Sequence, residues 1–227
     1  MSDEISTAEP AADPRSSDDE SPEVRALVER AAAGDQAANT DLFSRYRERL
    51  KRMVHLRMNR GLQGRVDDSD VIQEAQIDAA RRLPEYAKDP QLPFFLWLRQ
   101  LAGLKLLEFH RRHLGIEMRD AAQELSLYRG ALPEADSVSL AAQLLGTITS
   151  PSENAVKAET RIYVEEALNA MDPIDREVLA LKHFEQLSTN EIARVLGLSK
   201  AGAGSRYLRA IKRLRTTLSQ IPGFQGM

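Results

Sequence analysis

The most constraining feature of the sequence is a short pattern that specifies two helices joined by a tight turn. Ser188-Thr-Asn-Glu191 has the spacing of a capping box, in which the serine hydroxyl and the glutamate carboxylate each accept a hydrogen bond from the other's backbone amide. Gly197 is suited to the left-handed conformation that ends such a helix, and Ser199 can cap a new helix after a three-residue turn. The pattern therefore predicts a helix-turn-helix.

The second helix of this pair, over 200–218, is expected to be amphipathic and basic. Its predicted apolar stripe consists of Tyr207, Ile211, Leu214 and Leu218. Six basic residues and no acidic residue lie between positions 200 and 215: Lys200, Arg206, Arg209, Lys212, Arg213 and Arg215. Because phosphate neutralisation supplies most non-specific affinity for DNA, this pattern favours a recognition helix. A helical hairpin with a solvated basic face is the alternative that spacing alone leaves open.

The remaining sequence favours helix over strand, since Ala, Leu, Arg and Glu recur and aromatic residues make up only 5%. We therefore predict an all-α protein.

The absence of cysteine excludes disulfides, thiol nucleophiles and cysteine zinc sites. The most apolar run, 94–107, is too short to span a bilayer and contains Arg99 and Lys105. With no signal-peptide pattern at the start, we expect a cytoplasmic protein that does not enter a membrane.

Breaks in the pattern predict two small helical domains joined by a flexible linker. Residues 1–22 form an acidic, Ser/Pro-rich tail that we expect to be disordered. Residues 23–114 read as helices over 23–33, 36–60, 68–83 and 93–113, with a break at Pro84. Residues 115–156 are the predicted linker, 157–219 the second domain and 220–227 a short tail. The first 23 residues carry a net charge of −7, so the overall −3 conceals a basic remainder of +4.

The helix predicted to begin near Asp68 has one apolar and one polar face. Asp70, Gln73, Glu74 and Ile77 share the polar face, which ordinary capping and solvation would explain. The carboxylates at 67–74 are also oxygen ligands that magnesium accepts. No phosphate-binding glycine loop or catalytic partner accompanies them, and we predict no metal and no cofactor.

The helix over 93–113 begins with aromatic residues and ends with basic ones. Trp97 is more typical of a core than of a stacking platform. Aromatic side chains followed by Arg99, Lys105 and Arg111 nevertheless suit a surface that meets single-stranded DNA, where bases stack and cations hold the backbone.

These two blocks, in this order and separation, resemble the sigma-70 family of RNA polymerase sigma factors. The resemblance is to its extracytoplasmic-function (ECF) members, which keep only regions 2 and 4. Residues 67–79 resemble region 2.2, residues 94–112 regions 2.3 and 2.4, and residues 171–218 region 4. Region 4 signatures include Glu191-Ile-Ala193, Leu196-Gly-Leu-Ser199 and Ser205-Arg206. The implied fold is a region 2 helical bundle joined to a region 4 helix-turn-helix.

The resemblance implies a non-catalytic protein that binds core RNA polymerase and promoter DNA, with an anti-sigma factor as a possible further partner. The positions that match polymerase-docking residues are Asp70, Gln73, Glu74 and Gln76. Those implied for the minus-ten element are Trp97, Arg99, Lys105, His110, Arg111 and Arg112. Those implied for the minus-thirty-five element are Lys200, Ala201, Gly202, Ser205, Arg206, Arg209 and Arg213. The promoter sequence and inducing signal are not implied.

Two departures from the family pattern concern DNA reading. Gly103-Leu104 replaces a common Arg-Asn pair near the melted strand, and Gly202-Ala203-Gly204 replaces the usual Thr-Val-Lys of the recognition helix.

Two competing functions remain open from the residues alone. One is a helix-turn-helix regulator that binds DNA without polymerase, and the other is a metal-dependent phosphoryl-transfer enzyme using the carboxylates at 67–74.

Overall fold

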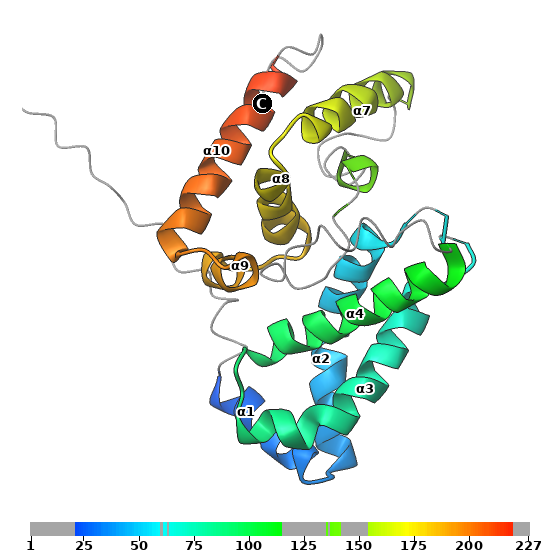
Figure 1. Ribbon diagram of the computed structural model, residues 1–227, viewed down its shortest axis with the longest axis vertical. Helices are drawn as coiled ribbons and strands as arrows, with labels where there is room; N and C mark the ends of the chain where they lie inside the picture. Colours follow the sequence, from blue (N-terminus) through cyan, green and yellow to red (C-terminus); the bar gives the residue numbers. More distant parts are fainter. Residues whose placement is uncertain are drawn as a thin grey trace, which may run out of the picture.

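The computed structural model describes residues 21–59, 61–62, 64–114, 135, 137–141 and 154–219. All of its bounded elements are helices, arranged in two groups (Figure 1). The N-terminal module contains α1 (Pro22–Ala32), α2 (Gln36–Arg57), α3 (Asp68–Lys88) and α4 (Phe94–Leu114). The C-terminal module contains α7 (Asn154–Asn169), α8 (Pro173–Leu179), the π-helical turn η2 (Ala180–Phe184), α9 (Thr189–Leu196) and α10 (Lys200–Leu218). The predicted all-α class is confirmed.

Side-chain caps set the starts of the N-terminal helices. Asp35 accepts hydrogen bonds from the amides of residues 37 and 38 at the start of α2. Asp67 accepts from the amide of Ser69 at 2.7 Å, and Asp70 accepts from the amide of Asp67 at 3.2 Å, so α3 begins with a capping box. Because these bonds satisfy amides that have no partner within the helix, each helix starts where the polar residue stands.

Helix α3 continues past the proline at which the sequence pattern ended it. The expected end was residue 83, but the helix runs through Pro84 to Lys88. Beyond the proline, Tyr86 stacks on Trp97 with ring centroids 4.4 Å apart and donates a hydrogen bond to the Leu92 carbonyl at 2.8 Å. The expectation was wrong because this packing offsets the hydrogen bond that proline removes.

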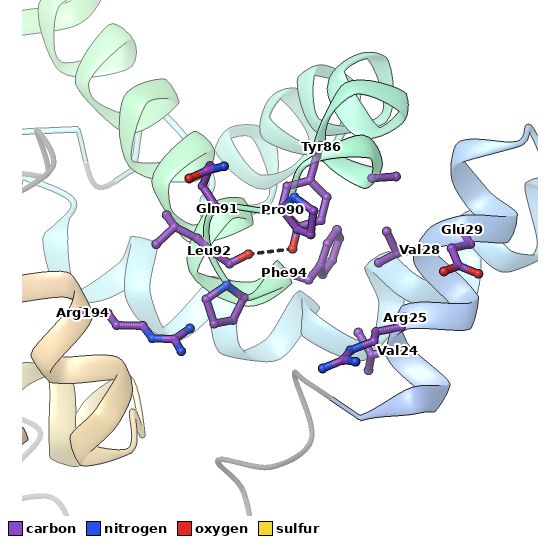
Figure 2. Close-up of a pocket in the computed structure, with 12 residues that line it drawn as sticks. Val24, Arg25, Val28, Glu29, Tyr86, Pro90, Gln91, Leu92, Phe94 and Arg194 are labelled. Atoms are coloured by element: carbon purple, nitrogen blue, oxygen red, sulfur yellow. Dashed lines mark hydrogen bonds between the residues drawn. The ribbon is translucent and has the colours of Figure 1, made fainter.

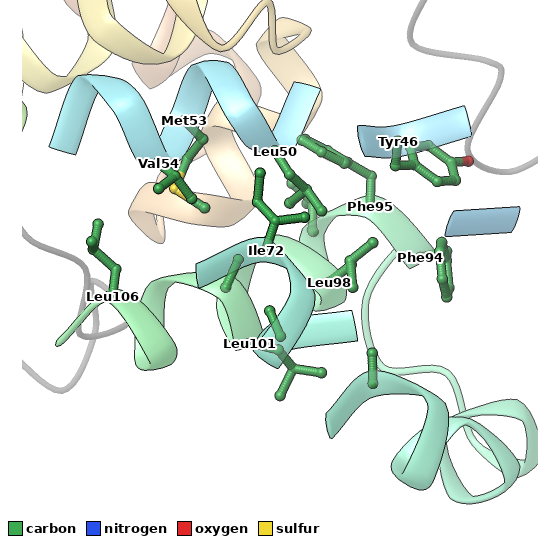
Figure 3. Packing of buried hydrophobic residues seen from close by; sticks show 14 of the residues in the cluster. Tyr46, Leu50, Met53, Val54, Ile72, Phe94, Phe95, Leu98, Leu101 and Leu106 are labelled. Carbon is green, nitrogen blue, oxygen red and sulfur yellow. The ribbon is translucent and has the colours of Figure 1, made fainter. Parts of the chain in front are cut away.

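The core of the N-terminal module lies between α2, α3 and α4 (Figure 3). Its fully buried side chains include Leu50 and Met53 from α2, Ile72 from α3, and Phe95 and Leu98 from α4. The spacing of these residues places them on one face of each helix, as an amphipathic pattern requires. This core holds the polar face of α3 and the basic end of α4 at the surface.

The C-terminal module has its own buried cluster, which includes Leu168, Phe184, Ala210 and Leu214. Residues 137–141, within the predicted linker, are helical, and Leu140 is buried in this cluster. This part of the linker is therefore packed, which differs from the flexible connection expected. The rest of the predicted linker, except Ala135 and the α7 residues 154–156, lies outside the described residues. The acidic tail to residue 20 and the C-terminal tail 220–227 lie outside them too.

The two modules are in direct contact (Figure 1). A single hydrophobic cluster continues from the N-terminal module to Leu181, Leu187 and Ile192 of the C-terminal module, and Leu56 of α2 belongs to the C-terminal cluster. The interface is thus part of the packed interior.

Among the helices that the structure describes, none is both long and apolar enough to cross a membrane.

Candidate nucleic-acid interface

The predicted helix-turn-helix is present as α9 and α10. The Glu191 amide donates to the Ser188 hydroxyl at 3.2 Å, and the Ser188 amide donates to the Glu191 carboxylate at 2.7 Å. Gly197 adopts the left-handed conformation, with φ 63° and ψ 33°. Ser199 then caps α10 by accepting from the Gly202 amide at 3.0 Å. The capping box, the turn and both helix starts are confirmed.

Helix α10 presents one face to the module and the other to solvent. Ala203, Ala210 and Leu214 are buried, whereas Tyr207 and Ile211 are only half-buried. The buried stripe therefore includes two alanines that the sequence pattern missed, because small side chains allow α8 and α9 to approach α10 closely. The side chain of Leu218 lies outside the described set.

Most of the predicted minus-thirty-five residues lie on the exposed side of α10. Lys200, Ala201, Ser205, Arg209 and Arg213 are exposed, and Gly202 is half-buried. The side chains of Lys212 and Arg215 are exposed on the same helix.

Two of the predicted DNA-reading arginines are held within the module by Asp175 of α8. The Arg206 guanidinium lies 3.1 Å from Asp175, whose carboxylate is buried, and Arg213 lies 3.5 Å from it. Arg206 is itself half-buried, so part of its role is to hold α10 against α8. Arg213 remains 59% exposed.

Arg99, one of the predicted minus-ten residues, is buried and is therefore not presented to DNA in this arrangement. It is 4% exposed, and its Nη2 donates to Glu185 of the C-terminal module at 3.1 Å. The expectation of a surface arginine is corrected here because the C-terminal module covers this part of α4.

His110, another predicted minus-ten residue, is also buried, at 2% exposed. Its Nε2 accepts a hydrogen bond from the Asn59 amide at 3.2 Å. Burial lowers the pKa of His110 to about 4, so its ring is neutral at pH 7. The expected contact with DNA is corrected here because the side chain of His110 turns into the N-terminal module, where it contacts Asn59.

The other predicted residues of α4 lie nearer the surface. Trp97 is half-buried and stacks on Tyr86, which fits the core role rather than a free stacking platform. Lys105 pairs with Asp78 of α3 at 2.7 Å, and this hydrogen bond raises the pKa of Lys105. Arg111 and Arg112 are exposed at the end of α4, with Arg112 over the Phe109 ring at 5.4 Å. These two arginines are the accessible cations of the predicted minus-ten surface.

The predicted polymerase-docking face lies along α3. Asp70 and Gln73 are exposed, Glu74 and Gln76 are half-buried, and Ile77 is 46% exposed among them. A single exposed apolar side chain is ordinary on a protein surface, so the face is predominantly polar.

The carboxylates considered for a metal have local structural partners. Asp67 and Asp70 form the capping box of α3, and Asp68 lies 3.0 Å from the Nδ1 of His55. Across the described residues, no three acidic or histidine side chains converge in a way that could hold a metal ion.

A buried cluster of charges between the modules is the feature that sequence reasoning missed. Glu185 is 0% exposed and accepts from Arg57 Nε at 2.9 Å and from Arg99 Nη2 at 3.1 Å. Glu177 completes the cluster, with an oxygen 2.5 Å from Arg57. Burial alone would raise the pKa of Glu185, but the two guanidiniums outweigh it and lower the pKa to about 2. No local pattern signals this cluster, because Glu185 lies 86 residues from Arg99 and 128 residues from Arg57 in the sequence.

A pocket of about 510 Å³ lies at the edge of the same contact (Figure 2). Its apolar lining includes Val24, Leu92 and Phe94, and the side chains of Arg25 and Arg194 extend toward it from α1 and α9. The N-terminal module forms most of its wall, and Arg194 is the lining residue that comes from the C-terminal module.

The arrangement defines a two-module helical protein in which a helix-turn-helix with a basic exposed face packs against a separate bundle. Residues 161–214 match the family described as sigma-70, region 4. The chain is 29% identical over 208 residues to the ECF RNA polymerase sigma factor ShbA of Streptomyces griseus, covering 89% of this chain and 99% of that protein. It is 25% identical over 190 residues to the ECF sigma factor SigD of Mycobacterium tuberculosis, covering 84% and 81%.

The fold is also similar to a solved structure, that of CnrH in complex with the cytosolic domain of CnrY. The TM-score is 0.51 at 23% identity, covering 86% of this chain and 96% of CnrH. Over most of its length the chain is similar to ECF sigma factors, and its C-terminal module matches the sigma-70 region 4 family. The resemblance inferred from the two motif blocks is confirmed.

Proposed function

We propose that this protein is an ECF sigma factor that binds core RNA polymerase and directs promoter-specific initiation of transcription. The observation that supports this most directly is the α9–α10 helix-turn-helix with its exposed basic face, within residues that match sigma-70 region 4. The relatives cover both modules, so a helix-turn-helix regulator acting without polymerase is not favoured. The role is non-catalytic, because phosphodiester chemistry belongs to the polymerase, and the site of action is the cytoplasm.

Each module has a proposed share of the task. The exposed side of α3, with Asp70, Gln73, Glu74 and Gln76, docks on the polymerase. Arg111 and Arg112 of α4 contact the minus-ten element. The exposed residues of α10 read the minus-thirty-five element in the major groove, where an α-helix fits.

A protein inhibitor of the anti-sigma type is a further proposed partner. Its support is that the similarly folded CnrH was solved in complex with the cytosolic domain of another protein, CnrY. The Ile77 surface of α3 and the pocket between the modules are two places where such a partner could bind.

Run-off transcription with purified core polymerase on a promoter library tests the proposal. We expect specific transcripts only when the protein is present. Substituting Gln73 and Glu74 together with alanine is expected to abolish core binding, whereas alanine at the exposed pair Arg82 and Glu85 of the same helix serves as the matched control. Transcripts that do not depend on the protein, or equal core binding by the two double variants, would contradict the proposal.

A further inference from the structure

The outward face of α10 is apolar at its centre, although the helix as a whole is basic. Ala203, Ala210 and Leu214 are buried against the rest of the module. At 3.6 residues per turn, Ala201 and Leu208 lie on the opposite side of the helix from these three residues. Leu208 is 68% exposed, more than any other large hydrophobic residue that the structure describes. An apolar side chain therefore projects from the middle of the surface proposed to meet DNA.

The residues around Leu208 in the first half of α10 are small. Gly204 and Ser205 precede it by one turn and Ala201 by two turns, and we call these four residues the outward row. A Cβ built at Gly204 would meet no atom within 4 Å, so the space beside Leu208 is open. Small residues allow a helix backbone to approach a ligand closely. Leu208 is then the side chain of the row that extends furthest toward that ligand.

The basic side chains of α10 lie beside the outward row or beyond it. Arg206 lies against α8, with its guanidinium 3.1 Å from the buried Asp175 carboxylate. Lys200 and Arg209 are each next in sequence to a residue of the row, so they point about 100° away from it around the helix. Lys212 shares the direction of Leu208 but lies one turn nearer the C-terminus. Cations in these places suit the phosphates that border a groove, and such contacts position a protein without carrying sequence information.

The composition of α10 restricts how it can distinguish bases. The helix contains no Asn, Gln, Asp or Glu, so it lacks the side chains that pair with adenine through two hydrogen bonds or accept from the cytosine amino group. Base edges are contacted by the N-terminal part of a recognition helix. There the outward row offers apolar contact from Ala201 and Leu208, and a single hydroxyl from Ser205. The base that presents an apolar group in the major groove is thymine, through its 5-methyl group.

Resting on the proposed function, we propose that Leu208 is a specificity-determining residue that recognises thymine in the minus-thirty-five element by packing on its 5-methyl group. The flanking cations hold α10 across the phosphates, and Leu208 supplies the discrimination between bases. Burial of one methyl group corresponds to a factor of roughly four in affinity. Cytosine at the same position is disfavoured by roughly tenfold, because its amino group loses water and finds no acceptor on leucine.

The experiment removes single methyl groups from the DNA. Holoenzyme formed from core polymerase and the full chain first selects promoters from a duplex library randomised across the minus-thirty-five region. Each thymine of a selected element is then replaced in turn by deoxyuridine, which pairs in the same way and lacks only the methyl group. We expect at least one replacement to weaken binding of the parent by roughly fourfold, as measured by fluorescence anisotropy. In Leu208→Ala the same replacement should have no effect, because its contact is already missing.

The matched control is Ile162→Ala, which shortens an exposed apolar side chain of α7 in the same module. This variant should keep the sensitivity of the parent to deoxyuridine. Each result is a ratio between two DNA duplexes bound by one protein, so it does not depend on core affinity or on the amount of folded protein. Because Leu208 is exposed, its truncation leaves the packing of α10 intact.

The outcomes separate the thymine contact from the proposed function. Selected elements without thymine, a parent insensitive to every replacement, or a Leu208→Ala variant as sensitive as the parent overturns the contact even if the holoenzyme directs run-off transcription. If the chain binds no core polymerase, the same replacements are measured with the chain alone on duplexes that it selects. A loss that depends on Leu208 then retains the thymine contact and overturns the sigma function, whereas failure to select any sequence overturns both.

Discussion

Two glycines near the start of α10 give a prediction in which the same substitution stabilises the protein at one position and has almost no effect at the other. A glycine within a helix costs about 1 kcal/mol relative to alanine, because its backbone loses more freedom on folding. A Cβ built at Gly204 meets no atom within 4 Å, so Gly204→Ala should raise the free energy of unfolding by about 1 kcal/mol. A Cβ at Gly202 lies 3.1 Å from the hydroxyl of Ser199, which caps the helix. Displacing that hydroxyl costs about 1 kcal/mol, so Gly202→Ala should be close to neutral.

Urea denaturation of the two variants and the parent, followed by circular dichroism, measures this difference. The midpoint should rise for Gly204→Ala and stay nearly constant for Gly202→Ala, with the denaturant slope unchanged in both. Equal midpoints for the two variants, or a lower midpoint for Gly204→Ala, would refute the reasoning about the space around each glycine.

The same variants test how closely α10 approaches DNA. Gly204 is half-exposed, one turn beyond the exposed Lys200 and next to Ser205, on the side expected to face the promoter. The new methyl group would stand between the helix backbone and the DNA. We therefore expect Gly204→Ala to bind promoter DNA more weakly despite its greater stability, as measured by fluorescence anisotropy of the holoenzyme.

Three further predictions concern the stability of the two modules. Ser188→Ala removes the acceptor of the Glu191 amide and should cost about 1 kcal/mol, measured by urea denaturation, whereas an unchanged midpoint would contradict the capping role. Leu98→Ala should cost about 2–5 kcal/mol because Leu98 is fully buried, and a smaller loss would mean that the site collapses around the missing atoms. The pKa of His110 falls from 6.5 in the unfolded chain to about 4 in the fold. The free energy of unfolding therefore has its full value, with respect to His110, above pH 6.5. It decreases by about 3 kcal/mol as the pH falls from 6.5 toward 4, because the unfolded chain binds the proton more tightly. His110→Gln should flatten this part of the stability profile, and an equally steep profile in the variant would assign the slope to other groups.

The sequence by itself determined the local structure of this protein and its class. The capping box at Ser188, the left-handed turn at Gly197 and the start of α3 at Asp67 were all predictable, because caps and turns depend on neighbours within about four residues. The basic exposed face of α10 followed from helical periodicity alone. These local features were sufficient to identify both family blocks.

Only the tertiary structure decided which of the predicted site residues reach the surface. Arg99 and His110 are buried, and α3 continues through Pro84, because side chains of other helices cover or support them. The partner of Arg99 is Glu185, which lies 86 residues away and beyond the predicted linker. A sequence pattern specifies what a residue can bind, but its burial and its charge partner depend on packing between segments that are distant along the chain. The cluster that joins the modules therefore has no signature in the sequence.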